Sequence, residues 1–224
     1  MKALFLGYRD WAIKVFDSIR ENPAIENETP ICKSEKDLAR YDLSEYDLLI
    51  TCGWSEELGS KIADSILSVG VHCAELDRYS YGTPIQLQII DGINFSKHRL
   101  FKFVGPKNSN RAHTHTREYS HEVDLDFTGS MEEILRQMTA TSIVLFNMFL
   151  SDYPDINWKV WDSETIKKKA RTPADSYIDM DSFSRKSTLE LYNLIRCLES
   201  PYPNLCLKDG EGSLYFEKVR YKKK

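Results

Sequence analysis

The chain has 224 residues, of which 42% are hydrophobic and 29% charged, a composition that predicts a folded globular protein and excludes a disordered one. The formal net charge of −4 disfavours nucleic acid as a partner, because phosphate binding needs a basic surface. No apolar run approaches the roughly 20 residues that cross a bilayer, and the first residues are too polar for a signal peptide, so we expect neither a membrane span nor secretion.

The five cysteines contain no CxxC pair, which disfavours a disulfide framework or a zinc ribbon. Cys52 and Cys73 stand in apolar, strand-like segments, where a reduced thiol behaves as a small core residue. We therefore expect a reducing, cytoplasmic setting.

The first third of the chain alternates predicted strands and helices. Short apolar runs predict strands at 2–7, 46–53 and 69–73, and helical spacing predicts helices at 10–20, with Asp10 as a cap, and at 55–67. This order is typical of a parallel sheet with crossover helices. Such sheets bind ligands beyond the carboxyl ends of their strands, so His72, at the end of the third strand, is expected to project into a crevice. The first loop lacks GxGxxG, which disfavours a dinucleotide site.

The pattern then changes. The remaining predicted elements are a helix at 83–91, alternating strands at 98–104 and 119–127, a long helix at 131–150 behind a Ser130–Glu133 capping box, an irregular connector at 154–186, a helix behind a Ser187–Glu190 capping box, and a strand at 213–220.

Residues 70–92, GVHCAELDRYSYGTPIQLQIIDG, resemble the central motif of the folate-dependent formyltransferases. The matching positions, in order, are His72, Leu76, Gly82, Pro84, Ile85, Gln86, Ile90 and Gly92. Three later stretches also resemble the family: 124–134 (DLDFTGSMEEI), 171–175 (RTPAD) and 189–205 (LELYNLIRCLESPYPNL). The resemblance implies a Rossmann-like α/β formyltransferase domain with a mostly parallel sheet over residues 1–160. A connector and a small C-terminal helix-plus-strand extension would follow over 161–224.

The activity that the resemblance implies is transfer of a formyl group from 10-formyltetrahydrofolate to a primary amine. The PIQ and LYNLIR stretches resemble the sugar-nucleotide branch, so the expected acceptor is an amino sugar carried by a nucleotide. No metal cofactor is expected. Family members are often dimers, which makes a homodimer a further expectation.

Site residues follow from the same resemblance. His72 matches the family histidine that donates a hydrogen bond or a proton to the formyl oxygen. The residues expected to line the donor pocket, mostly through backbone groups, are Tyr81, Gly82, Thr83, Pro84, Ile85 and Gln86. The residues expected to contact the acceptor substrate are Tyr8, Arg9, Asp10, Trp54 and Arg196.

Two positions depart from the family pattern. The catalytic asparagine two residues before the histidine is Gly70, and the stretch expected to hold the catalytic aspartate, 114–117, has neither aspartate nor glycine. Either His115 or His113 acts as the base, or the chain has lost formyl transfer. It would then use another donor or bind its ligand or a partner protein without turnover.

Other chemistry-bearing residues have plainer interpretations. His113 and His115 could join His72 or His121 in a zinc site for hydrolysis, but a polar loop is the simpler interpretation. We expect His98 and His121 on the surface and the Asp124–Asp126 pair on a solvated strand face. Trp158 and Trp161 are expected to anchor the connector.

Overall fold

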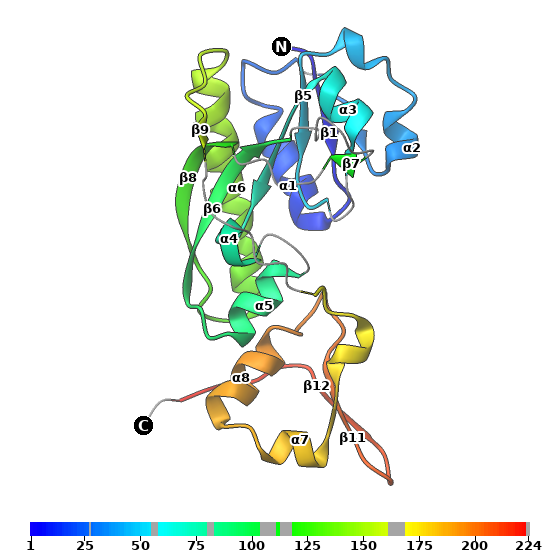
Figure 1. Cartoon of the computed structure of the whole chain (residues 1–224), viewed down its shortest axis with the longest axis vertical. Helices are drawn as coiled ribbons and strands as arrows, with labels where there is room; N and C mark the ends of the chain where they lie inside the picture. The colour runs from blue at the N-terminus through cyan, green and yellow to red at the C-terminus, as the bar shows by residue number, and fades with distance from the viewer. Residues whose placement is uncertain are drawn as a thin grey trace. The chain divides into compact units, whose positions relative to one another are not determined.

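The computed structural model describes residues 1–26, 28–54, 58–79, 83–103, 111–112, 118–160 and 169–222 (Figure 1). The chain forms two compact units, each made of segments that are discontinuous in sequence. The first unit comprises Met1–His72, Lys97–Asp124 and Met138–Ser163, and the second comprises Cys73–Ser96, Leu125–Gln137 and Glu164–Lys224. The domain boundary at residue 160 stays a prediction, and segments from before it contribute to both units.

A seven-stranded sheet in the order β2-β1-β3-β5-β6-β8-β9 confirms the predicted α/β class. Its strands are β1 (Ala3–Leu6), β2 (Ile31–Cys32), β3 (Leu48–Thr51), β5 (Leu67–His72), β6 (Phe95–Lys102), β8 (Glu118–Asp126) and β9 (Lys159–Val160). The strands from β2 to β5 run parallel, whereas β6 is antiparallel to β5 and β9 to β8. The register pairs Leu6 with Thr51 and Thr51 with Gly70, so β1, β3 and β5 end near one level.

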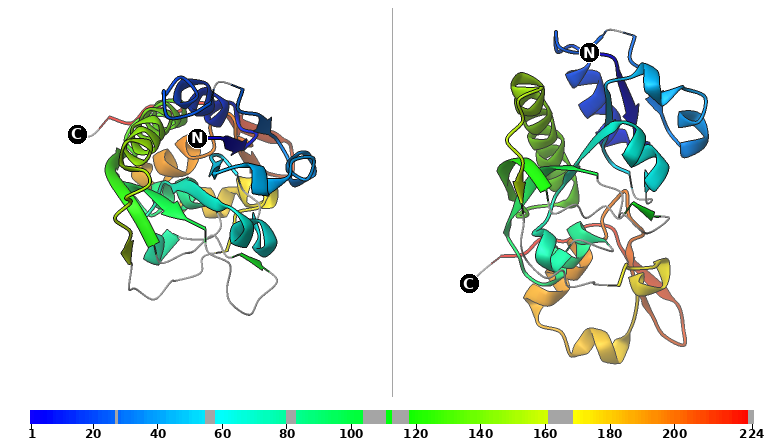
Figure 2. Two further views of the ribbon diagram at one scale, coloured as in Figure 1. Left: turned by 90° about the horizontal axis from the view of Figure 1, so that it is seen from above. Right: turned by 45° about the horizontal axis from the view of Figure 1, so that its top comes forward.

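Helices of the first unit cover both faces of this sheet. Helix α1 (Asp10–Ile19) and the long helix α6 (Met131–Asp152) place Phe16 and Phe146 in one apolar cluster with Phe5. In the right-hand view of Figure 2, α6 (yellow-green) runs beside the green strands. Helices α2 (Glu35–Leu38) and α3 (Ser60–Ser65) cover the opposite face of the sheet. Strands that are buried on both faces explain the continuous apolar runs in the sequence.

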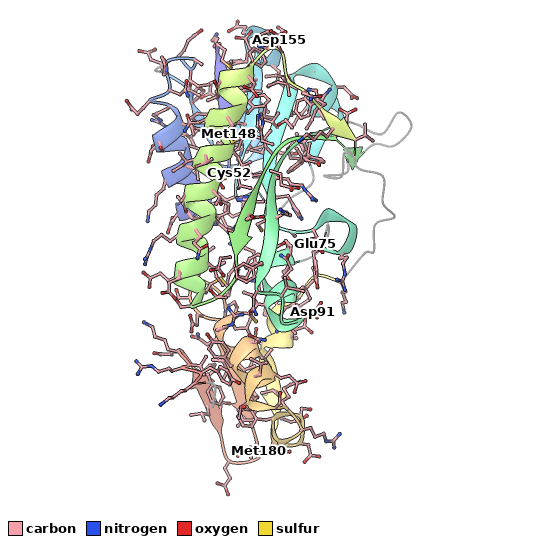
Figure 3. All side chains as sticks on the ribbon, turned by 90° about the vertical axis from the view of Figure 1, so that its left-hand side faces the viewer. Cys52, Glu75, Asp91, Met148, Asp155 and Met180 are labelled. Atoms are coloured by element: carbon pink, nitrogen blue, oxygen red, sulfur yellow. The ribbon has the colours of Figure 1, made fainter. Side chains whose placement is uncertain are left out.

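The second unit contains the C-terminal extension. Its elements are α4 (Leu76–Tyr79), α5 (Pro84–Ile90), the 3-10 turn η2 (Pro173–Ser176), α7 (Met180–Ser184), α8 (Thr188–Arg196) and the strands β10 (Tyr177–Asp179), β11 (Leu205–Lys208) and β12 (Ser213–Phe216). Strand β10 is parallel to β11 and β11 is antiparallel to β12. Both predicted capping boxes are present: Ser187 and Glu190 cap α8, and the Ser130 hydroxyl donates to Glu133 Oε2 at 2.8 Å. In Figure 3, Met180 marks the start of α7, and Asp91, just after α5, accepts a hydrogen bond from the Tyr79 hydroxyl at 2.8 Å.

Several sequence expectations were wrong in detail. Arg9, not Asp10, is the N-cap of α1, and its side chain makes no capping hydrogen bond. The segment 154–186 is not irregular throughout, because β9, η2, β10 and α7 lie in it, and β11 was not predicted. These elements are too short to show a period in the sequence. The other minor elements are the 3-10 turn η1 (Leu43–Glu45) and the strands β4 (Leu58–Gly59) and β7 (Arg111–Ala112).

All five cysteines are buried and form no disulfide, which confirms Cys52 and Cys73 as core residues; the cytoplasmic location stays a prediction. Trp158 packs on the core of the first unit, with its ring centroid 6.2 Å from that of Phe149, and so anchors the chain after α6 as predicted. Trp161 lies outside the described residues. Within the described ranges, no helix has the length and apolarity needed to cross a membrane.

Candidate functional site

Three neighbouring parallel strands of the first unit end at one edge of the sheet. Tyr8 and Arg9 follow β1, Trp54 follows β3, and His72 is the last residue of β5. Because loops that leave the carboxyl ends of adjacent parallel strands diverge, this edge is where an α/β sheet offers a ligand crevice. The topology therefore brings four of the predicted site residues to one edge.

An aromatic and cationic cluster occupies the β1 and β3 side of this edge. The ring centroids of Tyr8 and Trp54 are 5.8 Å apart in an edge-to-face arrangement, and the Arg9 guanidinium carbon lies 5.3 Å from the Tyr8 centroid. Asp10 begins α1 beside them and is exposed. The Trp54 indole Nε1 is buried and has no acceptor in the described part of the chain. Such a cluster can hold a planar or sugar ring and a negative charge.

His72 lies half-buried on the β5 side of the edge. It pairs with Arg99 across β5 and β6, and its ring contacts Phe101 edge-on at a centroid distance of 6.5 Å. Alternate residues of a strand share a face, so His72, Gly70 and Phe101 lie on the same face of the sheet.

The structure leaves no room for an asparagine side chain at position 70. A Cβ atom built on Gly70 would lie 2.4 Å from the Thr51 hydroxyl, 3.0 Å from the Phe103 ring and 3.1 Å from the Phe101 ring. The Thr51 hydroxyl donates to the Val69 carbonyl at 3.1 Å. The missing family side chain is thus replaced by packed rings and a hydroxyl that already has an acceptor.

The expectation that His98 lies on the surface is wrong. Its side chain is 0% exposed, because this face of β6 is covered by α6, and its Nδ1 is 2.7 Å from the Thr141 hydroxyl. The Thr141 hydroxyl also donates to the Met138 carbonyl at 3.2 Å, and Nε2 of His98 has no partner in the described residues. Burial, and secondarily repulsion from His72, lowers the pKa of His98 to about 3.

His121 is also less exposed than expected. Its side chain is 11% exposed and its Nε2 lies 3.0 Å from a carboxylate oxygen of Asp152, at the end of α6. Neither the burial of His98 nor the half-burial of His121 was predicted, because the sequence does not state which face of these strands the long helix covers.

The described donor-loop residues lie in the second unit. Thr83 precedes α5 without capping it, and Ile85 is buried. Gln86 is also buried, at 5% exposure. Tyr81 and Gly82 lie outside the described residues, as do His113 and His115, and the roles of all four stay predictions.

Arg196 has structural partners. It is 2% exposed, and its Nη1 donates to the carbonyls of Phe127 at 2.6 Å and Gly129 at 3.0 Å, while its Nε donates to Asn193 Oδ1 at 3.0 Å. Burial lowers the pKa of its guanidinium. These bonds hold the start of α6 to α8, and a role toward substrate stays a prediction.

Neither a metal site nor a paired-carboxylate site is formed by the described residues. They contain no group of three or more histidines, cysteines and acids able to hold a metal ion. Asp124 is exposed and ion-paired with Lys97 at 2.6 Å, and Asp126 accepts from the Thr128 backbone N–H at 2.7 Å. Asp124 therefore lies on a solvated face as expected, whereas Asp126 is half-buried.

Comparison with known proteins adds to this geometry. No family model matches the sequence, and no curated protein matches it. Among solved structures, the chain is similar to a methionyl-tRNA formyltransferase from Clostridium thermocellum, with a TM-score of 0.78 and 22% identity over 99% of this chain and 94% of that one. It is also similar to a 4-N formyltransferase from Francisella tularensis, with a TM-score of 0.73 and 15% identity over 99% and 98% of the two chains. HypX from Aquifex aeolicus, solved with tetrahydrofolic acid, matches with a TM-score of 0.68 and 12% identity over 93% of this chain and 36% of that chain.

Proposed function

Because the chain has the Rossmann-like fold of the formyltransferases, we propose that it is an enzyme that transfers a formyl group from 10-formyltetrahydrofolate to the amine of a nucleotide-linked amino sugar. The similarity to two formyltransferases supports formyl transfer, and the HypX complex with tetrahydrofolic acid supports a folate-type donor. The PIQ stretch at 84–86, the LYNLIR stretch at 191–196 and the net charge of −4 favour a sugar acceptor over a tRNA.

In such a transfer, an amine nitrogen bonds to the formyl carbon, the bond from that carbon to the donor nitrogen breaks, and the proton lost by the amine passes to that nitrogen. Negative charge gathers on the formyl oxygen during the step, and a hydrogen-bond donor held there lowers the barrier. We assign His72 to this oxygen and keep His115 or His113 as the proposed base.

The observation that carries the proposal is the position of His72. It ends β5 at the edge of the sheet where β1 and β3 also end, with the Tyr8–Trp54 cluster on the same edge. A nucleotide-linked sugar offers rings and phosphates to such a cluster.

Substitution of His72 by alanine tests the assignment. Native protein and His72→Ala would be incubated with 10-formyltetrahydrofolate and a panel of nucleotide-linked amino sugars, with formylated product followed by mass spectrometry. We expect a roughly 10²–10³-fold loss of turnover at an unchanged melting temperature, because a transition-state donor is lost.

A matched control is His121→Ala, which removes a histidine outside the proposed site and should leave turnover unchanged. A His72→Ala protein that is folded and fully active would contradict the assignment.

A second candidate function is favoured by the packing around Gly70. Since Thr51, Phe101 and Phe103 fill the space of the family asparagine, the chain could bind a nucleotide-linked sugar without formyl transfer. Saturable sugar-nucleotide binding by a native protein that forms no product with any acceptor of the panel would select this alternative.

A further inference from the structure

One row of side chains crosses three neighbouring strands of the first unit at the level of His72. His72, the last residue of β5, is the Cα partner of Arg99 on β6, and Arg99 Nε donates to Glu122 Oε2 on β8. Paired residues of adjacent antiparallel strands lie on the same face of a sheet, with their Cβ atoms about 5 Å apart. The row therefore places a cation beside His72 and an anion one strand further away.

The positive charge of Arg99 is held close to the sheet. Its side chain is 17% exposed, and its guanidinium carbon lies 5.1 Å from the centroid of the Tyr119 ring. A guanidinium keeps its charge at every ordinary pH, and a partly buried charge is screened less than one in water. Glu122 offsets only part of this charge at His72, because β6 separates β8 from β5 and neighbouring strands are about 4.8 Å apart.

Two buried titratable groups near this row carry no charge. Burial, and secondarily repulsion from His72, lowers the pKa of His98 to about 3, so its imidazole is neutral. Burial raises the pKa of the Cys73 thiol to about 12, so it is neutral as well. The remaining charged groups are the ion pair of Lys97 with Asp124 on the next row, Arg9 and Asp10 after β1, which lies two strands from β5, and Glu75 in the second unit.

A neutral and a charged imidazole act differently on a formyl group. A neutral imidazole donates a hydrogen bond to the formyl oxygen and keeps its proton, whereas an imidazolium can transfer a proton to that oxygen. Burial and an adjacent cation both disfavour the imidazolium, and His72 is half-buried against Phe101 and beside Arg99. We propose that Arg99 is a positioning residue that keeps the His72 imidazole neutral, so that His72 stabilises the formyl oxygen by a hydrogen bond without giving up a proton.

This inference rests on the proposed function for the formyl group, but the charge of His72 is measurable without any substrate. In the transfer, the proton lost by the amine passes to the donor nitrogen and not through His72. The sequence agrees with a neutral imidazole, because residues 114–117, where the family aspartate is expected, contain no acid that would favour the imidazolium.

The test follows the titration of the His72 ring by NMR, with its signals assigned from the spectrum of His72→Ala. Arg99→Met removes the cation, Arg99→Lys keeps one, and Glu122→Gln removes the anion that partly offsets it. Lys102→Met is the matched control. Lys102 is also a β6 cation with a carboxylate partner, Glu118 at 3.7 Å, but it lies three residues further along the strand and so on the opposite face.

We expect native His72 to titrate below the ordinary midpoint of about pH 6.5. The midpoint should rise by about 0.5–1 pH in Arg99→Met and fall by a few tenths in Glu122→Gln, because these variants change the charge beside the ring in opposite directions. Arg99→Lys and Lys102→Met should titrate within about 0.2 pH of the native protein. If Arg99→Met does not fold, the fall in Glu122→Gln decides the question.

The outcomes separate this inference from the proposed function. Opposite shifts in Arg99→Met and Glu122→Gln support it, since a purely structural role of Arg99 would not move the titration both ways. A native midpoint above about pH 7, or equal midpoints in all variants, would overturn it.

The formyl-transfer assay adds a second readout. A native turnover that falls about tenfold per pH above the His72 midpoint would also overturn the inference, because an obligatory proton donor must be charged. If native protein forms no product with any acceptor, the proposed function fails, and the titration alone decides whether Arg99 keeps His72 neutral.

Discussion

Arg196 and Gly70 are both tightly surrounded, but for opposite reasons. Arg196, in the second unit, is a buried cation whose hydrogen bonds go to two backbone carbonyls and an asparagine side chain. Gly70, in the first unit, has no side chain, and rings fill the space that a side chain would need. A residue predicted to touch substrate thus has a structural role, whereas a departure from the family pattern is built into the packing. The resemblance of the motif is thus confirmed for the fold, whereas the roles of these two positions toward a substrate stay predictions.

The largest loss of stability is expected from substitution of Arg196. Arg196→Met should lower the free energy of unfolding by about 3 kcal/mol or more, because buried carbonyls of Phe127 and Gly129 lose their donor. Urea denaturation followed by circular dichroism measures this. A variant with native stability but a raised KM for the acceptor would instead indicate that Arg196 contacts the substrate.

A smaller loss is expected at Gly70. Gly70→Asn should destabilise the protein by roughly 1–3 kcal/mol, since the new side chain meets Thr51, Phe101 and Phe103, and it should not raise turnover. Thermal unfolding and the formyl-transfer assay check both parts.

A double-mutant cycle with Thr51→Ala isolates the clash. Because the Thr51 hydroxyl is the nearest atom, Gly70→Asn should cost less stability in the Thr51→Ala background than alone. Strictly additive losses, or faster turnover by Gly70→Asn, would show that the space is not filled in the way the structure has it.

The last expected effect is a pH dependence of stability from His98. An ordinary histidine, as in the unfolded chain, takes up a proton near pH 6.5, but folded His98 does so only near its pKa of about 3. Between these values the unfolded state binds the extra proton, so this contribution to stability is complete above pH 6.5 and declines as the pH falls toward 3.

His98→Leu removes that proton-binding difference. Its melting temperature should therefore fall less steeply than that of the native protein between pH 7 and pH 4, although the lost bond to Thr141 lowers its stability at neutral pH. If the melting temperatures of the two proteins fell equally steeply with pH, His98 would have to be more solvated than it is in the structure.

Much of the fold could be predicted because its main elements repeat their patterns over many residues. The long helix behind Ser130, the strands that end at Thr51 and His72 and the capped helix after Ser187 all carry strong local signals. The two-residue strands β2 and β9 carry almost none, so β2 was missed and β9 was merged into a connector.

The candidate site could be predicted only as far as strand ends and motif positions define it. His98 is buried because the long helix covers its face of β6. The choice of that face depends on packing between segments that are distant in the sequence. The burial of Gln86 and Gln88 also depends on such packing, and the Gln88 side chain accepts a hydrogen bond from the Ser96 hydroxyl. The burial of Arg196 could not be predicted either, because the two carbonyls that accept its hydrogen bonds lie more than 60 residues earlier in the chain.

The discontinuous make-up of the two units has a consequence for synthesis on the ribosome. Translation begins at the N-terminus, so β1, β3 and β5 leave the ribosome long before Met138–Ser163 has been made. That segment is the last part of the first unit. The second unit takes residues from both sides of that segment and is completed only with the last part of the chain. Neither unit can close early, so we expect nascent chains shorter than about 160 residues to expose apolar strands and to depend on chaperones.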